Sequence, residues 1–194
     1  PPNATVAVID EEPHRSSMAY QSLQADMYLE GDAARTIRDI TSAIEQRGVN
    51  KDAVEQRRSK LAKSHDDLMK QKEALFELAR KKTPIDPVWV CACLGEVMPK
   101  GTAYIDEVTS HTPLLREYIM WNEPQSLFTR QGGLGQGIGL SLGVKLAKPD
   151  APAVTLIGDG AFLYNPVLQS LGASRDFDLP VIIVIFNNRK YASM

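Results

Sequence analysis

Two continuous apolar runs, at residues 153–159 and 181–187, stand out in the C-terminal half of the chain. Runs of this length without polar alternation are typical of strands buried on both faces of a parallel sheet. Shorter apolar runs at residues 5–10 and 102–108 also predict strands. A segment with Pro166 near the start of a helical pattern separates the two long runs, which predicts a strand–helix–strand unit. The pattern indicates an α/β fold, in which a parallel sheet is flanked by helices.

The spacing of apolar positions divides the chain into three parts. Residues 32–44 have helical spacing with Asp32 as a cap, and we assign residues 1–48 to the end of an α/β domain. Residues 49–83 carry dense alternating charge and one apolar line with a spacing of seven. A single line without a second one argues against a coiled coil and predicts a surface or connecting helix. Residues 84–194 form the third part.

Further elements are predicted within this third part. Asp86 is expected to cap a helix that starts at Pro87. A polar turn at residues 109–112 follows the strand at 102–108, and residues 126–131 form a short extended piece. Residues 135–147 then predict a helix with small residues on one face.

Composition narrows the class of protein. With 194 residues, of which 43% are hydrophobic and 24% charged, the chain can bury a core. A net charge of -2 gives no broad field for nucleic acid or an anionic membrane, so neither partner is expected. No apolar run approaches the roughly 20 residues of a membrane span, and the N-terminus has no signal-peptide pattern. We therefore expect a soluble, cytoplasmic protein. The start at Pro1-Pro2 and the end at Met194 just after a strand predict a segment of a longer polypeptide.

Cysteines and histidines do not predict a transition-metal or redox site. Cys91 and Cys93 match neither a Cys-x-x-Cys pair nor a zinc ligand set, and they lie about 200° apart on a helix. The histidines, His14, His65 and His111, are far apart in the sequence. Structural thiols are the expected role of the two cysteines.

Acidic and amide side chains follow the two long apolar runs. Gly158-Asp159-Gly160 lies at the end of the first run. Asn187-Asn188 lies at the end of the second run, and 26 residues separate Gly160 from Asn187. A right-handed crossover brings both strand ends to the carboxyl edge of one parallel sheet, where open α/β sheets bind ligands. Adjacent strands lie about 4.8 Å apart and Mg²⁺ binds oxygen at about 2.1 Å, so one ion can bridge them. The sequence therefore predicts a site for Mg²⁺ and a diphosphate.

The glycine-rich segment Gln131–Gly143 is the third feature. Its glycines allow backbone to approach a ligand, and the start of the helix offers amide donors to an anion. The alternative is a helix that packs closely through its glycines. A dinucleotide site is disfavoured because no Gly-x-Gly-x-x-Gly register fits and no convincing buried strand precedes the segment.

These features, in this order, resemble the cofactor domain of thiamine-diphosphate enzymes. Residues 84–194 resemble the diphosphate-binding domain of the acetolactate synthase, pyruvate oxidase and benzoylformate decarboxylase superfamily, with spacing most similar to benzoylformate decarboxylase. Residues 1–48 are similar to the end of the middle domain of that superfamily. The resemblance implies an incomplete thiamine-diphosphate-binding fold, with thiamine diphosphate and Mg²⁺ as cofactors.

The resemblance also implies roles for individual residues. Asp159, the Asn188 side chain and the Lys190 carbonyl would bind Mg²⁺. Gly160 and Ala161 would offer amides to the diphosphate, although Ala161 replaces the serine of some relatives and removes one hydroxyl donor. The full set implied to contact the cofactor is Ser110, His111, Gly132, Leu134, Gly158, Asp159, Gly160, Ala161 and Asn188.

Two positions would act on the conformation of the cofactor. Leu134 would lie under the thiazolium and force the bent conformation, and the Gly132 carbonyl would accept from the 4'-amino group. The alternative for Leu134 is an ordinary core leucine. For His111, which would contact the diphosphate with Ser110, the alternative is a plain surface-turn histidine.

The activity implied by the resemblance is decarboxylation of a 2-oxo acid by a lyase similar to benzoylformate decarboxylase. The alternatives are a carboligase similar to acetolactate synthase and a non-catalytic homologue that binds cofactor or partner subunits. The activating glutamate of the family comes from a pyrimidine-binding domain, and this chain contains no residue to which that role can be assigned. That domain would come from another subunit of a homo-oligomer. We therefore expect residues 1–194 alone to be inactive and poorly stable.

Overall fold

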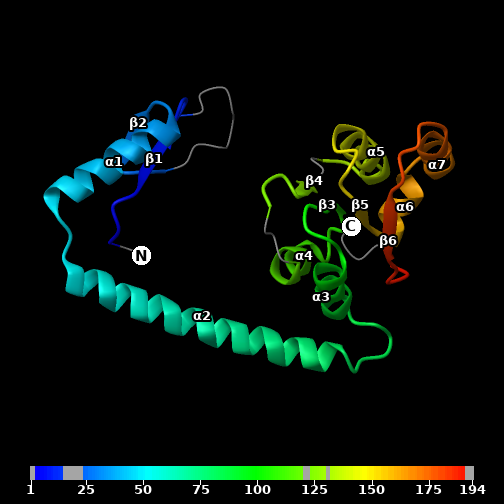
Figure 1. Cartoon of the computed structure of the whole chain (residues 1–194), viewed down its shortest axis with the longest axis horizontal. Coiled ribbons are helices and arrows are strands. Elements are labelled where there is room, and N and C mark those ends of the chain that lie inside the picture. The colour runs from blue at the N-terminus through cyan, green and yellow to red at the C-terminus, as the bar shows by residue number, and fades with distance from the viewer. Residues whose placement is uncertain (1–2, 15–23, 120–122, 130–131, 191–194) are drawn as a thin grey trace. The chain divides into compact units, whose positions relative to one another are not determined.

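Four segments of the chain are described by the computed structural model, namely residues 3–14, 24–119, 123–129 and 132–190 (Figure 1). The chain divides into two compact units, Pro1–Asp67 and Leu68–Met194. The division falls within one long helix, α2, in the charged part of the sequence.

The first unit contains a small parallel sheet and a capped helix. Strand β1 (Ala7–Asp10) pairs in parallel with β2 (Met27–Glu30), and α1 (Ala33–Arg47) follows. The Asp32 side chain accepts from the backbone N–H of Arg35 at 2.6 Å, so it caps the helix as the sequence predicts. Strand β2 has no counterpart among the predicted elements.

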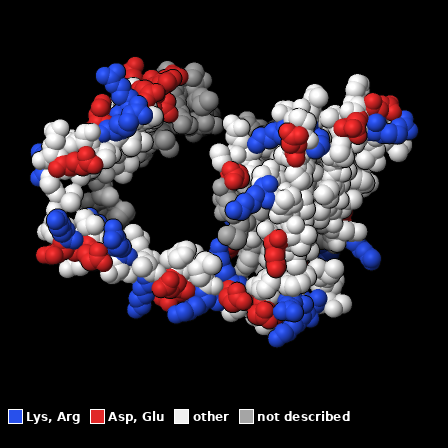
Figure 2. Space-filling model, in the orientation of Figure 1, with Lys and Arg blue, Asp and Glu red and all other residues white. Residues whose placement is uncertain are grey.

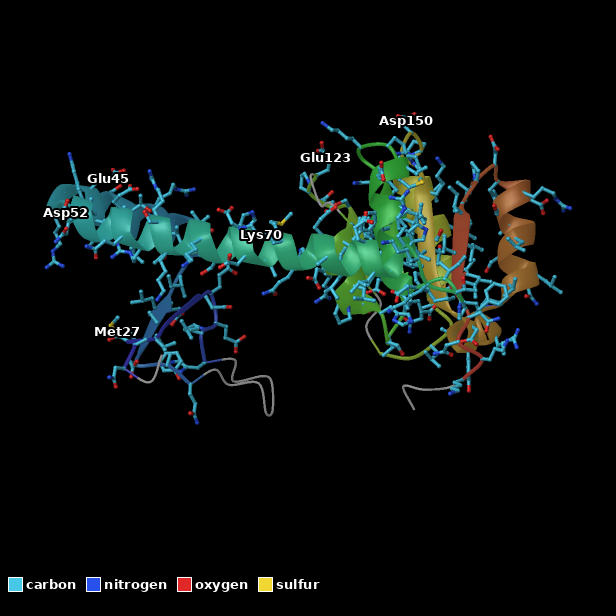
Figure 3. All side chains as sticks on the ribbon, turned by 90° about the horizontal axis from the view of Figure 1, so that it is seen from below. Met27, Glu45, Asp52, Lys70, Glu123 and Asp150 are labelled. Carbon is cyan, nitrogen blue, oxygen red and sulfur yellow. The ribbon has the colours of Figure 1, made fainter. Side chains whose placement is uncertain are left out.

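The charged segment forms a single helix, α2 (Lys51–Ala79). Its apolar line is largely exposed, with Leu61 at 69% and Leu75 at 52%. Figure 3 shows the side chains of Asp52 and Lys70 extending from this helix. A surface or connecting helix was predicted here, and the exposure of its leucines agrees with that prediction.

The last turns of α2 belong to the second unit and pack against α3 (Pro87–Val97). The rings of Phe76 and Trp89 lie 5.0 Å apart, and the Arg80 guanidinium lies 5.7 Å from the Trp89 ring centre. The end of the charged segment is therefore held by aromatic and cation–π contacts.

The second unit is built on a four-stranded parallel sheet, in the order β4-β3-β5-β6. Its strands are β3 (Ala103–Glu107), β4 (Leu127–Thr129), β5 (Ala153–Gly158) and β6 (Ile182–Phe186). β3 is buried along its whole length and β5 along all but its last residue, whereas β6 forms an edge. Because both inner strands are covered on their two faces, they lack polar alternation.

Helices cover both faces of this sheet (Figure 1). Besides α3, they are α4 (Thr112–Tyr118), α5 (Gly137–Ala147), α6 (Asp159–Tyr164) and α7 (Val167–Asp176). On one face, α3 and α4 share a core with alternate strand residues; this core contains Cys91, Tyr104, Val108, Leu115, Ile119, Val154 and Leu156. On the other face, α5, α6 and α7 share cores that contain Ala103, Ile105, Ile138, Val144, Ala153, Ile157 and Ala161. The predicted α/β fold with a helix-flanked parallel sheet is confirmed.

Several element boundaries differ from the prediction. Strand β5 ends at Gly158, and Asp159 is already the first residue of α6, a helix that the sequence did not predict. Helix α4 starts at Thr112, where only a polar turn was expected. The extended piece predicted at 126–131 is seen as β4, and its last two residues lie outside the described part of the chain.

The two cysteines are free thiols on α3. Cys91 is fully buried, and this burial raises the pKa of its thiol to about 12. Cys93 is only partly buried, and desolvation raises its thiol pKa as well. Both thiols are therefore poor nucleophiles, in line with the structural role that the sequence predicts.

Two further properties concern the helices and the charged surface. In the part of the chain that the structure describes, no helix combines the length and the apolar character needed to cross a membrane. Figure 2 shows basic and acidic side chains interspersed on the visible face. That face therefore has no large region of a single charge sign.

Close approach between two loops explains one glycine of the glycine-rich segment. Gly135 has a φ of +89°, and a Cβ added there would lie 2.5 Å from the carbonyl oxygen of Tyr164 at the end of α6. Both the left-handed backbone and the contact exclude a side chain. Gly139, within α5, has no neighbour within 4 Å of such a Cβ.

This contrast predicts opposite effects for the same substitution. Gly135→Ala should lower the free energy of unfolding by more than about 2 kcal/mol, because it adds backbone strain and a clash. Gly139→Ala should raise it by about 0.5–1 kcal/mol, because alanine favours the helix interior. Urea unfolding of the purified protein measures both changes. Equal stability of the two variants would contradict the close approach at Gly135.

Candidate functional site

Asp159 connects the ends of two neighbouring strands. It directly follows β5, and its carboxylate accepts from the N–H of Arg189 at 2.9 Å, 30 residues further along the chain and beyond the end of β6. The other carboxylate oxygen accepts from the N–H of Gly160 at 2.9 Å. The convergence of these strand ends at the carboxyl edge, which the sequence predicts, is present in the structure.

The chain turns sharply after β6. The Asn187 side chain accepts from the N–H of Arg189 at 3.0 Å, and the Asn188 side chain accepts from the N–H of Lys190 at 2.9 Å. Arg189 has a positive φ of 56°. Asparagine side chains that bond the backbone two residues on stabilise such a turn. The turn presents Asn188 and Lys190 at the surface, beside the partly buried Asp159.

The oxygen atoms beside Asp159, at the ends of β5 and β6, are suited to bind a hard cation. Asp159 supplies a carboxylate, Asn188 an amide oxygen and Lys190 a backbone carbonyl, and Mg²⁺ prefers oxygen ligands. Each of these oxygens has more than one lone pair, so the hydrogen bonds to backbone N–H groups leave acceptor capacity for a metal. The described residues contain no group of three or more His, Cys, Asp or Glu that could bind a metal. A cation here would therefore need further oxygens from a ligand, as Mg²⁺ in phosphate sites does.

His111 lies at the same edge of the sheet. It precedes α4, and its ring centre is 5.5 Å from that of Phe186, the last residue of β6. Burial lowers the pKa of the imidazole from its ordinary value, and the charge of Asp86 opposes this shift. The contact with Phe186 places His111 near the turn that contains Asn188.

The glycine-rich segment lies beside α6. Gly132 has a φ of +87°, and a Cβ added there or at Gly133 would meet no atom within 4 Å. Leu134 is partly buried and packs against the core of Ile138, Ile157 and Ala161. Leu134 thus has the core contacts of an ordinary leucine on one side, and the two open glycines precede it.

Two residues at the start of α6, Gly160 and Ala161, also belong to the predicted set, as do the exposed Ser110 and the partly buried Gly158. Gly160 is partly buried, and its N–H already contacts Asp159. Ala161 is buried at 7% exposure and packs on Ile138 and Ile157. A serine in place of Ala161 would put a hydroxyl near this apolar cluster, so alanine fits the packing of this chain.

A buried carboxylate that the sequence analysis left unassigned lies next to this edge. Glu107 ends β3 and is only 1% exposed. One of its oxygens accepts from the N–H groups of Gly135 and Gln136, at 2.7 and 3.0 Å. The other accepts from the N–H of Gly137 at 2.8 Å and from the Asn165 side chain at 2.9 Å.

This arrangement changes the interpretation of the glycine-rich segment. The amides at the start of α5 were expected to be offered to a bound anion, but in the structure their acceptor is the carboxylate of Glu107. A Cβ at Gly137 would lie 2.5 Å from a Glu107 oxygen, so this glycine serves close packing. The alternative of a closely packing helix therefore applies to Gly135 and Gly137, whereas a Cβ at Gly132 or Gly133 would meet no atom within 4 Å.

Two sequence signals point towards Glu107 and Asn165 in retrospect. Glu107 ends an apolar strand on an acid, as does the run before Asp159. The glycine pair at 135 and 137 leaves space for a large group on a neighbouring segment. Neither signal identifies the partner, because the residues lie 28 to 58 positions apart and share no periodicity.

Four other acids of this unit lie away from Asp159. Glu96 and Glu117 are exposed on α3 and α4, and Glu117 lies 3.8 Å from the Lys72 ammonium. Figure 3 shows Glu123 and Asp150 near the starts of strands, at the edge opposite the end of β6. None of these four carboxylates lies beside Asp159 in the described contacts.

A family model and several known proteins match this chain. Residues 107–194 match the family described as "Thiamine pyrophosphate enzyme, C-terminal TPP binding domain". The large subunit of acetolactate synthase from Buchnera aphidicola subsp. Schizaphis graminum is 31% identical over 192 residues, which cover 96% of this chain and 31% of that protein. Benzoylformate decarboxylase from Pseudomonas aeruginosa is 27% identical over 118 residues, which cover 60% and 22%.

A solved structure shows the same fold over part of the chain. Benzoylformate decarboxylase from Polynucleobacter necessarius matches with a TM-score of 0.51 and 33% identity, over 58% of this chain and 22% of that one. The chain spans about a third of the length of the acetolactate synthase subunits that it matches. The cofactor of this family is thiamine diphosphate with Mg²⁺. Residues 107–194 therefore match the C-terminal cofactor-binding domain of thiamine-diphosphate-dependent enzymes.

Proposed function

We propose that this chain is part of a thiamine-diphosphate- and Mg²⁺-dependent enzyme that decarboxylates 2-oxo acids, as a lyase of the benzoylformate decarboxylase kind. The observation that carries the proposal is the hydrogen bond from Arg189 to Asp159, which joins the two motif segments at the carboxyl edge of the sheet. The second candidate is a carboligase of the acetolactate synthase kind. Its support is the match to an acetolactate synthase subunit over 96% of this chain.

The chain's own residues would hold the diphosphate end of the cofactor. Asp159, the Asn188 side chain and the Lys190 carbonyl would bind Mg²⁺, whose remaining ligands would include diphosphate oxygens. Gly160, after the open position Gly158, and Ala161 would offer backbone amides. Ser110 and His111 would contact the diphosphate from the loop after β3. When bound, thiamine diphosphate supplies the electron sink for loss of CO₂ from a 2-oxo acid.

Positioning of the reactive end would depend on the glycine-rich segment. Leu134 would support the bent conformation of the cofactor, because its packing on the Ile138 cluster gives it a fixed base. The Gly132 carbonyl would accept from the 4'-amino group, and the space around Gly132 and Gly133 would let the cofactor approach the backbone.

Part of the active site would come from outside this chain. The glutamate that activates the cofactor is expected on a pyrimidine-binding domain of another subunit, in a homo-oligomer. The exposed edge around β6, where Ile182 and Ile185 are 46% and 43% exposed, is consistent with further covering elements. A cytoplasmic location and the domain limits at 48 and 83 stay predictions.

Removal of the proposed metal ligand tests cofactor binding. Asp159→Ala should weaken Mg²⁺-dependent binding of thiamine diphosphate by more than about 100-fold in the complete protein, because it removes a direct metal ligand. Substitution of a residue that only contacts a metal ligand typically costs about 10- to 100-fold. Calorimetric titration measures the affinity. Asp176→Ala, at the exposed end of α7, is the matched control and should bind as the parent does. Equal affinity of both variants would remove Asp159 from the metal site.

Truncation of the leucine tests cofactor positioning. Leu134→Ala should lower kcat by about 10- to 100-fold at saturating cofactor, with a smaller change in cofactor affinity, because misplacement acts mainly on kcat. Leu146→Ala removes the same atoms from α5 at a site that is 69% exposed, and it should leave kcat unchanged. Steady-state kinetics decide; an unchanged kcat in Leu134→Ala would make this residue simple core.

The reaction itself is tested on the full-length protein. With thiamine diphosphate and Mg²⁺ it should release CO₂ from aromatic or aliphatic 2-oxo acids, whereas residues 1–194 alone should release none. Product analysis separates an aldehyde, expected of the lyase, from a 2-hydroxy ketone formed by carboligation. Turnover by the segment alone would contradict the proposed division of the site. Cofactor binding without turnover in the full-length protein would favour the non-catalytic homologue.

A further inference from the structure

Glu107 and Asn165 form a polar pair inside an apolar environment. Glu107 is 1% and Asn165 6% exposed, and the Asn165 Nδ2 donates to the Glu107 carboxylate at 2.9 Å. The nearest core cluster consists of Ile138, Ile157 and Ala161. A carboxylate in such surroundings is stable only when hydrogen bonds replace its hydration.

The carboxylate of Glu107 meets this requirement with four N–H donors. Three are consecutive backbone amides at positions 135 to 137, and the fourth is the Asn165 amide, all at 2.7 to 3.0 Å. An ionised carboxylate is an acceptor only, so four donors and two oxygens match in number and kind. The three backbone amides precede or open α5, whose dipole also favours a negative charge at this end.

Asn165 extends the connection to a third segment. Its Oδ1 accepts from the N–H of Ile138 at 3.1 Å, and its Nδ2 also donates to the carbonyl of Ala161 at 2.9 Å. Both the oxygen and the nitrogen of the Asn165 side chain are thus hydrogen-bonded, and these partners determine how the side-chain amide is oriented. Asn165 therefore binds the start of α5 to α6 while it contacts Glu107.

The pair joins three segments that the proposed function uses separately. Glu107 is three residues before Ser110, and the first amide it binds belongs to Gly135, next to Leu134. Asn165 is the C-cap of α6, the helix that Asp159 begins. A shift in either side chain would therefore move the diphosphate contacts, the leucine and the metal ligand relative to one another.

We propose that Glu107, together with Asn165, is a positioning residue. It fixes the position of Leu134 relative to Asp159 and to the loop that contains Ser110. This inference rests on the proposed function for its effect on turnover. The hydrogen bonds that join Glu107 and Asn165 to residues 135–138, here called the lock, are present in the chain without cofactor. Glu107 contacts no reacting atom and acts only through the backbone that it holds.

Amide hydrogen exchange in the cofactor-free full-length protein tests the lock directly. In Glu107→Gln, the side-chain NH₂ must face at least one of the N–H donors, so exchange at residues 135–137 should accelerate by at least about 10-fold. The matched control is Val144→Ala, which removes core packing of α5 without touching the Glu107 contacts. Unchanged exchange at residues 135–137 in Glu107→Gln, relative to this control, would overturn the proposal.

Kinetics then separate positioning from stability. Glu107→Gln should reduce kcat by about 10- to 100-fold at saturating cofactor, with substrate KM nearly unchanged, because misplacement of about 1 Å can cost about 100-fold. Val144→Ala, compared per folded molecule from its thermal unfolding curve, should keep the kcat of the parent. The same kcat loss in both variants would show a merely structural role and overturn the inference.

A charge exchange provides the rescue. Asn165→Asp places a second carboxylate against Glu107 and should lower kcat as well. The combination of Glu107→Gln with Asn165→Asp restores a donor–acceptor pair between the two positions, so its loss of kcat should be smaller than the product of the single losses. Multiplicative losses would contradict the pairing. If the parent protein neither binds thiamine diphosphate nor turns over, the proposed function fails, while the exchange measurement still decides on the lock.

Discussion

The burial of one carboxylate constrains the whole carboxyl edge of the sheet. Glu107 lies at the end of the central strand β3, where water does not reach it, and its charge must be balanced by donors from the protein. The N-terminal amides of α5 are suited to this, because helix starts have N–H groups without partners within the helix. Once these amides bind Glu107, the position of α5 against β3 is set within hydrogen-bond distance.

This requirement divides the glycines of the motif by cause. Gly137 must lack a side chain because the carboxylate of Glu107 occupies that space, and Gly135 because the Tyr164 carbonyl does. Gly132 and Gly133 have free space where a Cβ would be. One short segment thus combines glycines that close packing requires with glycines that have free space at the Cβ position, and a count of glycines cannot distinguish the two.

The parts that the sequence predicts well are those governed by local pattern and topology. The apolar runs predict the parallel strands β5 and β6, and the crossover rule then brings Asp159 and the turn after Asn187 to one edge, as the structure has it. The predicted burial is confirmed for β5 but wrong for β6, which lies at the edge of the sheet and has no buried residue. Helices α4 and α6 escaped prediction because each has only six or seven residues, too few for a periodic signal. The Glu107–Asn165 contact escaped because a hydrogen bond across 58 residues depends on tertiary packing and leaves no spacing to read.

The same constraint explains why one domain fits relatives with different reactions. The groups at this edge are mostly backbone amides and carbonyls, a carboxylate and amide side chains, whose directions are fixed by strand ends and by the lock at Glu107. Such groups are suited to a diphosphate and a cation, which are the same whichever carbonyl compound reacts. Residues that select a substrate need a pocket of suitable shape with apolar contacts to that substrate. The partly buried Leu134 instead packs against the core of this chain. Residues that select a substrate can therefore change without altering the hydrogen bonds that build this edge, which agrees with matches to both an acetolactate synthase and a benzoylformate decarboxylase.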